Sequence, residues 1–304
     1  MKEPIQEYAK IGLVHFMLWK DCIKGAGDPS TVNTILDDPY FGAVEVSWIN
    51  DDAQRKAVAE AIRRSGKAVA FGAQPVLLTQ KLDINHLDEN ERRRGVDAVL
   101  SVIPQAYELG AHGFGLLSGK DVPESNRDRA KEQLVKSLVE IGRELGNHGS
   151  TPLVLETFDR VPYGKNCLIG PNEEAAEVAR EVRKSIPSFG LMIDLSHLPL
   201  QGESAQDAWA AAGEYVVHAH MGNCVMEKPE HPMNGDEHPP LGIPDGENGV
   251  DELADYLKVL LDGGYLSKAR KPFLSFEVSV FGDLTQQQVI EQSKQTLDAA
   301  WARL

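Results

Sequence analysis

Short apolar runs alternate with longer polar stretches along the whole chain. The runs are nearly continuous in apolar residues, as expected of strands that are covered on both faces. Eight of them are predicted to be strands: Ile11–Phe16, Ala43–Trp48, Ala68–Gln74, Gly113–Gly119, Pro152–Phe158, Phe189–His197, Val216–Asn223 and Pro272–Phe281. The pattern therefore indicates a sheet that lies inside the protein.

The polar stretches between these runs have helical periodicity. The predicted helices are Asp51–Ser65, Asp88–Leu109, Glu124–Leu145, Asn172–Ser185, Ala205–Gly213, Val250–Gly263 and Thr285–Leu304. Asp51 can cap the first helix, because its side chain can accept a hydrogen bond from a free backbone N–H. Three of the helices are expected to stop at Gly110, Gly146 and Gly263. The first connection contains only a short helical stretch, around Thr31–Leu36.

Strand and helix alternate eight times, which predicts an α/β fold, a single parallel (β/α)8 TIM barrel made of residues 1–304. A doubly wound open sheet is the alternative, but the chain has neither a GxGxxG after its first strand nor a GxxxxGK[ST]. The longest irregular stretch, Cys224–Gly249, is rich in Pro, Gly and Asn and follows the seventh strand. We expect it to form a lid over the barrel mouth, with a disordered surface insertion as the alternative.

Charge and composition narrow the class of function. The chain has 31 Lys and Arg against 46 Asp and Glu, a formal net charge of −15, which argues against nucleic acid and anionic membranes as partners. No apolar run approaches the roughly 20 residues of a membrane span, and the N-terminus lacks the order of a signal peptide, so a cytoplasmic protein is expected. Cys22, Cys167 and Cys224 are widely spaced and are expected to be free thiols.

Polar residues end the last four predicted strands. Glu156, Asp194, His220 and Glu277 each follow several apolar residues. Carboxylates are costly to bury unless a cation compensates them, and the active site of such a barrel lies at the C-terminal ends of its strands. Taken singly, each residue is explained as a hydrogen-bonded structural group. Together they predict a site for one divalent ion, with Mn²⁺ preferred and Mg²⁺, Co²⁺ or Zn²⁺ possible.

Further polar residues are candidates for contact with a substrate. His197 follows Asp194 by three residues and could bond a substrate hydroxyl or relay a proton. His218 points to the same side of its strand as His220, and either supports the metal site or is a core histidine. Glu45 is expected to be a structural carboxylate low in the barrel. The substrate-binding candidates are His15, Gln74, Lys120, His218 and Asn223, with Lys165 as a further residue on the rim.

These residues carry a resemblance to a known family. Glu156 in LETFDR, Asp194 and His197 in DLSH, His220 in HAHMGN and Glu277 in SFEV resemble the xylose-isomerase-like barrel superfamily. The resemblance spans the whole barrel, although its specific motifs lie within residues 152–282. It implies that Glu156, Asp194, His220 and Glu277 bind one divalent ion, and that His197 contacts the substrate.

The phrases GLVHFM, FGAQP, LIGP and SFEVSVFGD are similar to a branch of sugar phosphate isomerases and epimerases. That branch resembles the α-subunits of C-glycoside deglycosidases, which cleave a carbon–carbon bond in 3-keto-C-glycosides together with a small β-subunit. The sequence departs from the family's pattern at two places, and both bear on the substrate rather than on the metal. Met226 is found where ketose 3-epimerases have an Arg, and the PGxGE-like turn is replaced by PDGEN, Pro244–Asn248.

The resemblance implies an enzyme that acts on a ketose or ketoglycoside. A metal ion would stabilise the enediolate that forms when the proton α to a carbonyl leaves, and Glu156 and Glu277 would take and return that proton. Epimerisation, isomerisation and elimination share this step. An abasic-site endonuclease and a noncatalytic sugar-binding subunit are weaker alternatives. The expected partners are a small-molecule sugar or glycoside, and either copies of the same chain or a small β-subunit.

Overall fold

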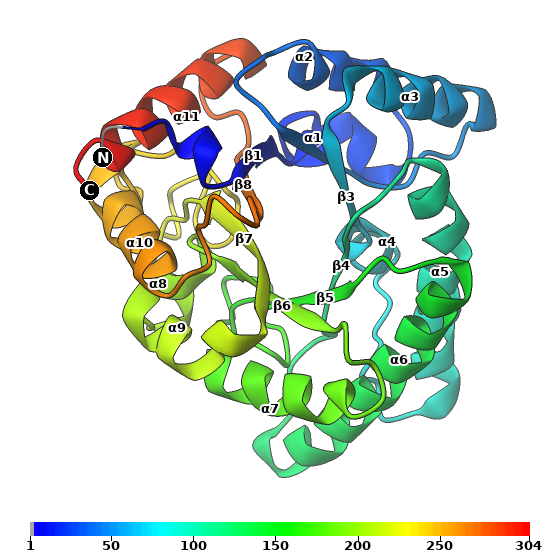
Figure 1. The fold of residues 1–304 in the computed structure, drawn as a ribbon. Coiled ribbons are helices and arrows are strands. Elements are labelled where there is room, and N and C mark those ends of the chain that lie inside the picture. The colour runs from blue at the N-terminus through cyan, green and yellow to red at the C-terminus, as the bar shows by residue number, and fades with distance from the viewer. Residues whose placement is uncertain (1–2) are drawn as a thin grey trace.

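The computed structural model describes residues 3–304, in which eight parallel strands surround a common axis (Figure 1). The strands are β1 Lys10–Leu13, β2 Ala43–Val46, β3 Ala68–Gly72, β4 Phe114–Leu117, β5 Leu153–Glu156, β6 Gly190–Asp194, β7 Val216–Gly222 and β8 Phe273–Glu277. Each strand from β2 to β7 pairs with the next one in the chain, and β1 pairs with β8. A parallel bridge between Val14 and Glu45 joins β1 to β2 and nearly closes the ring. The predicted TIM barrel is confirmed, and the open sheet is wrong.

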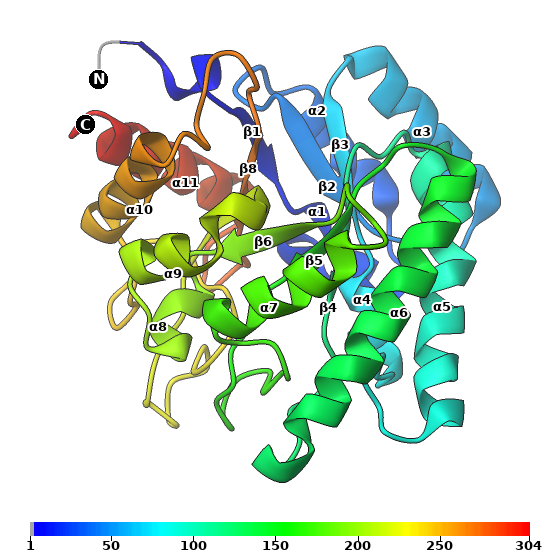
Figure 2. The same ribbon diagram turned by 60° about the horizontal axis from the view of Figure 1, so that its bottom comes forward.

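A ring of helices covers the outside of the barrel (Figures 1 and 2). The longer ones are α3 Asp52–Ser65, α5 Glu89–Glu108, α6 Arg127–His148, α7 Asn172–Arg183, α9 Ala205–Ala212, α10 Val250–Asp262 and α11 Gln286–Trp301. Asp51 caps α3 as predicted, since its carboxylate accepts a hydrogen bond from the N–H of Gln54. Gly146 does not end α6, because that helix continues to His148 and Gly149 follows it.

Short helices follow several strands where the sequence predicted longer strands. These helices are α1 His15–Leu18, α4 Gln74–Gln80 and α8 His197–Gln201. The apolar residues of these segments pack over the barrel end, and an apolar run of this length does not distinguish a strand from a short buried helix. Consequently His15, Gln74 and His197 each begin a helix. The remaining short elements are η1 Ile5–Glu7, η2 Lys20–Lys24, η3 Pro29–Val32, α2 Asn33–Leu36, η4 Glu124–Asn126 and η5 Gly213–Tyr215.

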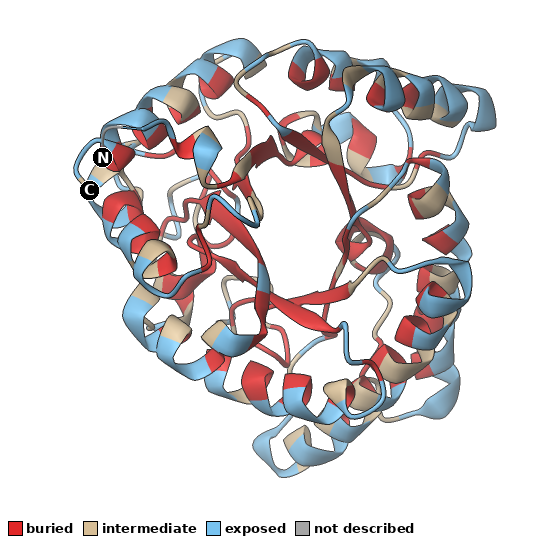
Figure 3. Ribbon diagram, in the orientation of Figure 1, coloured by how far each residue is buried: buried red, intermediate tan, exposed pale blue. Residues whose placement is uncertain are grey.

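Burial follows this two-layer arrangement, with the strands buried and the outer faces of the helices exposed (Figure 3). β2, β5 and β6 are buried at every position, which accounts for their uninterrupted apolar character. The segment 224–249, which we call the β7–α10 loop, contains no helix or strand. It lies at the same end of the barrel as α8 (Figure 2). Within residues 3–304, no helix is both long and apolar enough to cross a membrane.

Candidate metal centre

Four consecutive strands bring polar side chains to one end of the barrel. Glu156, Asp194 and Glu277 are the last residues of β5, β6 and β8, and His220 lies in β7 beside Asp194. Parallel pairing puts the C-terminal ends of these strands at one edge of the sheet, so the four side chains converge. All four are buried, with at most 7% of each residue exposed.

The convergence is close enough for one ion to be shared. One ligand atom from each of the four residues lies within 4.8 Å of the others. The Nδ1 atom of His220 is 2.7 Å from Glu277 Oε2, 3.4 Å from Glu156 Oε1 and 3.8 Å from Asp194 Oδ2. Among the described residues, neither Glu156 Oε1 nor Asp194 Oδ2 has a hydrogen-bond partner. Buried carboxylate oxygens without partners are costly, and a divalent cation would satisfy both.

The charges of the set depend strongly on one another. Burial opposes ionisation of Glu156, but the imidazoles of His197 and His220 outweigh it and lower the pKa of Glu156 to about 2. Burial, together with the negative charge of Glu156, raises the pKa of Glu277 to about 7 against the opposing effect of His238. Burial also works against a charged His220, but Glu45 and Glu277 raise the pKa of its ring well above the usual range. Without a metal ion, the imidazolium of His220 supplies the positive charge that the carboxylates need, and an ion bound at Nδ1 would take the place of the Nδ1 proton.

A second buried cluster lies against this set. His197 comes from α8, while Asp236 and His238 come from the β7–α10 loop. Asp236 Oδ1 is 2.8 Å from His238 Nε2 and 3.5 Å from His197 Nδ1, and Lys165 Nζ is 3.0 Å from Asp236 Oδ2. Although burial opposes it, Asp236 raises the pKa of His197 to about 10 and that of His238 to about 9. Asp236 and His238 were not predicted, because their only signal in the sequence is the DEH triplet within a loop expected to cover the site.

The first half of the barrel contributes two polar contacts. The side-chain amide of Gln74, at the start of α4, donates a 2.7 Å hydrogen bond to Glu156 Oε2. Glu45 Oε1 is 2.7 Å from His218 Nε2 and 3.1 Å from His220 Nε2. The expectation that Glu45 lies low in the barrel is wrong, because its carboxylate contacts a residue of the candidate metal set.

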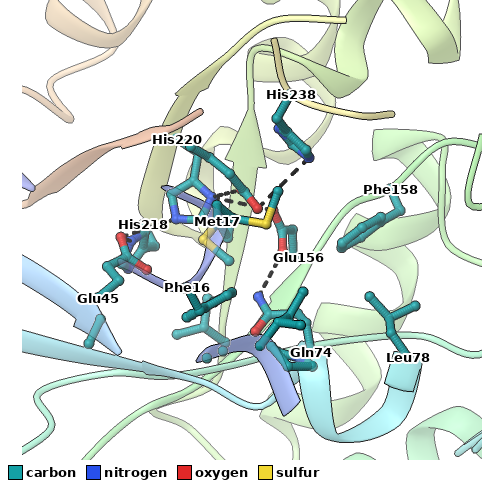
Figure 4. A pocket seen from close by; sticks show the side chains of 18 of the residues that line it. Phe16, Met17, Glu45, Gln74, Leu78, Glu156, Phe158, His218, His220 and His238 are labelled. Atoms are coloured by element: carbon teal, nitrogen blue, oxygen red, sulfur yellow. Dashed lines mark hydrogen bonds and ion pairs between the residues drawn. The ribbon is translucent and has the colours of Figure 1, made fainter. Parts of the chain in front are cut away.

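A cavity of about 170 Å³ opens beside these groups (Figure 4). Its polar lining includes Glu156, His220 and Glu277 together with Glu45, His218, Asp236 and His238. Its other wall is apolar and comes largely from the first half of the chain, with Phe158 from the segment after β5. The main apolar residues are Phe16, Met17, Ile23, Phe71, Leu78 and Phe158.

Four sequence-predicted substrate contacts lie outside the lining of this cavity, and one of them is His197. His15 is hydrogen-bonded through Nε2 to Thr31 Oγ1 at 2.8 Å and stacks on Trp19. Lys120 donates from Nζ to the backbone carbonyl of Lys165. Asn223 bonds backbone groups at both ends of the β7–α10 loop. Gln74, His218 and Lys165, in contrast, do line the cavity.

Several solved structures, sugar epimerases among them, share the fold. An L-ribulose 3-epimerase is 17% identical over 97% of this chain and 96% of its own, with a TM-score of 0.71. An IOLI protein with a bound zinc atom is 15% identical over 97% and 99%, with a TM-score of 0.70. The 3-keto-D-glucoside 4-epimerase YcjR from E. coli is 13% identical over 95% and 98%, with a TM-score of 0.61.

Among curated proteins, none matches this sequence. A match to a family model is stronger evidence of kinship than these fold likenesses, because it rests on the sequence pattern itself. The model of the xylose isomerase-like TIM barrel matches residues 40–299. This range includes all four residues of the candidate metal set and seven of the eight strands. The protein therefore belongs to the xylose isomerase-like TIM barrel family.

Proposed function

We propose that the protein is a divalent-metal-dependent enzyme of the sugar isomerase and epimerase type. Its substrate is a ketose or ketoglycoside, from which it removes the proton α to the carbonyl to form an enediolate. The observation that carries this proposal is the convergence of Glu156, Asp194, His220 and Glu277 beside a cavity, with two carboxylate oxygens lacking partners among residues 3–304.

The metal would be held by these four residues. A bound divalent ion, with Mn²⁺ preferred and Mg²⁺, Co²⁺ or Zn²⁺ possible, would polarise the substrate carbonyl and offset the negative charge that develops on its oxygen. Three carboxylates and one imidazole suit this group of ions. The fold likeness to a zinc-bearing IOLI protein supports a metal of this kind.

The protein's own carboxylates would move the proton. Glu156 and Glu277 lie on different strands, so one can take the proton at a carboxylate oxygen and the other can return one. Gln74 holds one oxygen of Glu156, and its own Oε1 is buried without a partner among the described residues. That oxygen can accept a hydrogen bond from a substrate hydroxyl. His197 does not line the cavity, but its Nε2 lies 3.8 Å from Glu156 Oε1, so it would act on the substrate through Glu156.

A carbon–carbon lyase acting on a 3-keto-C-glycoside is the second candidate. The apolar wall of Phe16, Leu78 and Phe158 favours it, since a free ketose has hydroxyls on most of its carbons and such a wall offers them no hydrogen bonds. The fold likeness to a 3-keto-D-glucoside 4-epimerase supports a ketoglycoside in either case. A small β-subunit, copies of the same chain and a cytoplasmic location remain predictions.

An abasic-site endonuclease is less well supported. A multinuclear zinc site of that class needs several His and carboxylate ligands from the first half of the barrel. Within residues 3–150, Glu45 is the sole His, Cys, Asp or Glu that lines the cavity. The net charge of −15 also opposes binding to a phosphate backbone.

The first test is the metal content of the purified protein, measured by elemental mass spectrometry. We expect about one Mn²⁺, Co²⁺, Mg²⁺ or Zn²⁺ per wild-type chain, and much less in Glu277→Gln and His220→Ala. Glu237→Gln is the matched control, because Glu237 lines the cavity but is not in the ligand set. Ketoses and 3-ketoglycosides are then screened for exchange of the α-proton with solvent deuterium. A wild-type chain that takes up no metal would exclude the proposed function.

A further inference from the structure

Glu45 connects the first half of the barrel to the candidate metal set. It lies in β2, and its carboxylate reaches across the interior to β7, where a single oxygen, Oε1, contacts His218 and His220 (Figure 4). All three residues are buried, each with at most 4% exposed. Neither the family model nor the fold likenesses give this residue a role.

The surroundings of Glu45 fix where the imidazole protons are. A buried carboxylate needs hydrogen-bond donors, and an ionised carboxylate can only accept. Nε2 of His218 and Nε2 of His220 are the two side-chain nitrogens bonded to Glu45 among the described residues. Both Nε2 atoms must therefore carry a proton that they donate to Glu45.

This arrangement has a direct consequence for the other nitrogen of His220. When a neutral imidazole carries its proton on Nε2, the lone pair is on Nδ1. Nδ1 is the atom that lies among Glu156, Asp194 and Glu277. Hydrogen bonds from a metal-binding histidine to a carboxylate generally fix both its tautomer and its ring orientation.

We propose that Glu45 is a positioning residue, which holds His220 in the tautomer and orientation that present Nδ1 to the metal. The inference rests on the proposed metal site. His218 supports Glu45 from the other side, because its ring stacks on Phe273 with 5.1 Å between centroids and cannot easily turn away. The backbone of Glu45 is fixed in turn by its bridge to Val14.

The test uses Glu45→Gln, which keeps the shape of the side chain but removes its charge. A Gln can turn its NH2 group toward His220, which would then accept at Nε2 and carry its proton on Nδ1, facing the carboxylates. We expect the dissociation constant for Co²⁺, followed by its visible absorption, to rise by about 10- to 100-fold. Glu45→Asp keeps the charge and should recover part of the affinity.

Ser47→Ala is the matched control. Ser47 is a buried polar residue just beyond β2, and its hydroxyl donates to the carbonyl of Gly72 rather than to the metal set. Its Co²⁺ affinity should stay within about twofold of the wild type, so a similar loss in Ser47→Ala would show that any disturbance of this region has the same effect. Equal Co²⁺ affinity in Glu45→Gln and wild type would overturn the inference.

A measurement on the wild-type chain decides the matter even if Glu45→Gln fails to fold. In protein labelled with ¹⁵N-histidine and loaded with Zn²⁺, His220 should show a proton on Nε2 that exchanges slowly with water, and metal on Nδ1. Metal on Nε2 would overturn the inference while leaving the proposed function intact. A wild-type chain that binds neither Co²⁺ nor Zn²⁺ would instead refute the proposed function.

Discussion

The two halves of the barrel differ in what their strands bring to the cavity. Strands β5 to β8 place Glu156, Asp194, His220 and Glu277 at one point. The segments of the first half bring mainly apolar side chains, and Glu45 is its one carboxylate in the cavity lining within residues 3–150. The comparison indicates that one half carries the candidate chemistry, while the other shapes the space beside it.

The largest expected effect is a difference in kcat between a variant of the second half and a variant of the first half. Glu156→Gln removes a carboxylate that we assign to proton transfer, so kcat for α-proton exchange should fall by about 10²- to 10⁴-fold. Phe71→Leu changes a cavity residue of the first half and should lower kcat by less than about tenfold, because it removes volume but no proton carrier. Metal content measured for both variants separates lost chemistry from lost ion. Equal losses of kcat at equal metal content would break the distinction between the halves.

The second prediction compares histidines of the two halves by how the free energy of unfolding depends on pH. Burial lowers the pKa of His15 to about 4, whereas His197, His220 and His238 of the second half have raised pKa values. The unfolded chain therefore binds a proton at His15 that the folded chain does not bind between about pH 6.5 and 4, so His15 reduces stability as the pH falls through that range. At pH 4, His15 lowers the free energy of unfolding by roughly 3 kcal/mol.

Urea unfolding of the wild type and of His15→Gln at pH 7 and pH 4 measures the contribution of His15 to the free energy of unfolding. The variant should lose less stability than the wild type between the two pH values. His148→Gln, which removes a histidine at the exposed end of α6, is the control and should behave as the wild type does. If His15→Gln and the wild type lose the same free energy of unfolding, His15 titrates equally in both states and the prediction is wrong.

The smallest effect concerns substrate choice. Leu78→Asn places an amide on the apolar wall, which should raise KM for an aryl 3-ketoglycoside by about five- to tenfold and leave kcat nearly unchanged. The same variant acting on a free ketose is the control, because a free ketose carries no aryl group to contact this wall. Equal changes of KM for both substrates would show that the apolar wall does not select between them.

The fold could be predicted because its strands are covered on both faces and its helices carry caps such as Asp51. Glu156, Asp194 and Glu277 could be predicted because a carboxylate after an apolar strand is costly to bury without a cation. Asp236 and His238 could not, since they lie in a loop without periodicity. Nor could the contact of Glu45, because alternation along a strand shows which side chains face inward but not what they meet across the barrel.

The base of the β7–α10 loop has a consequence for how the protein can change over evolution. Asn223 and Asn248 are hydrogen-bonded to each other where the loop begins and ends, and Asn248 also donates to the carbonyls of Leu195 and Gly222. The loop therefore leaves the barrel and returns to it at one fixed point. Apart from the buried Asp236 and His238, residues between these anchors can be replaced, inserted or deleted without moving β7 or α10, so substrate preference can diverge while the four-residue set is inherited unchanged.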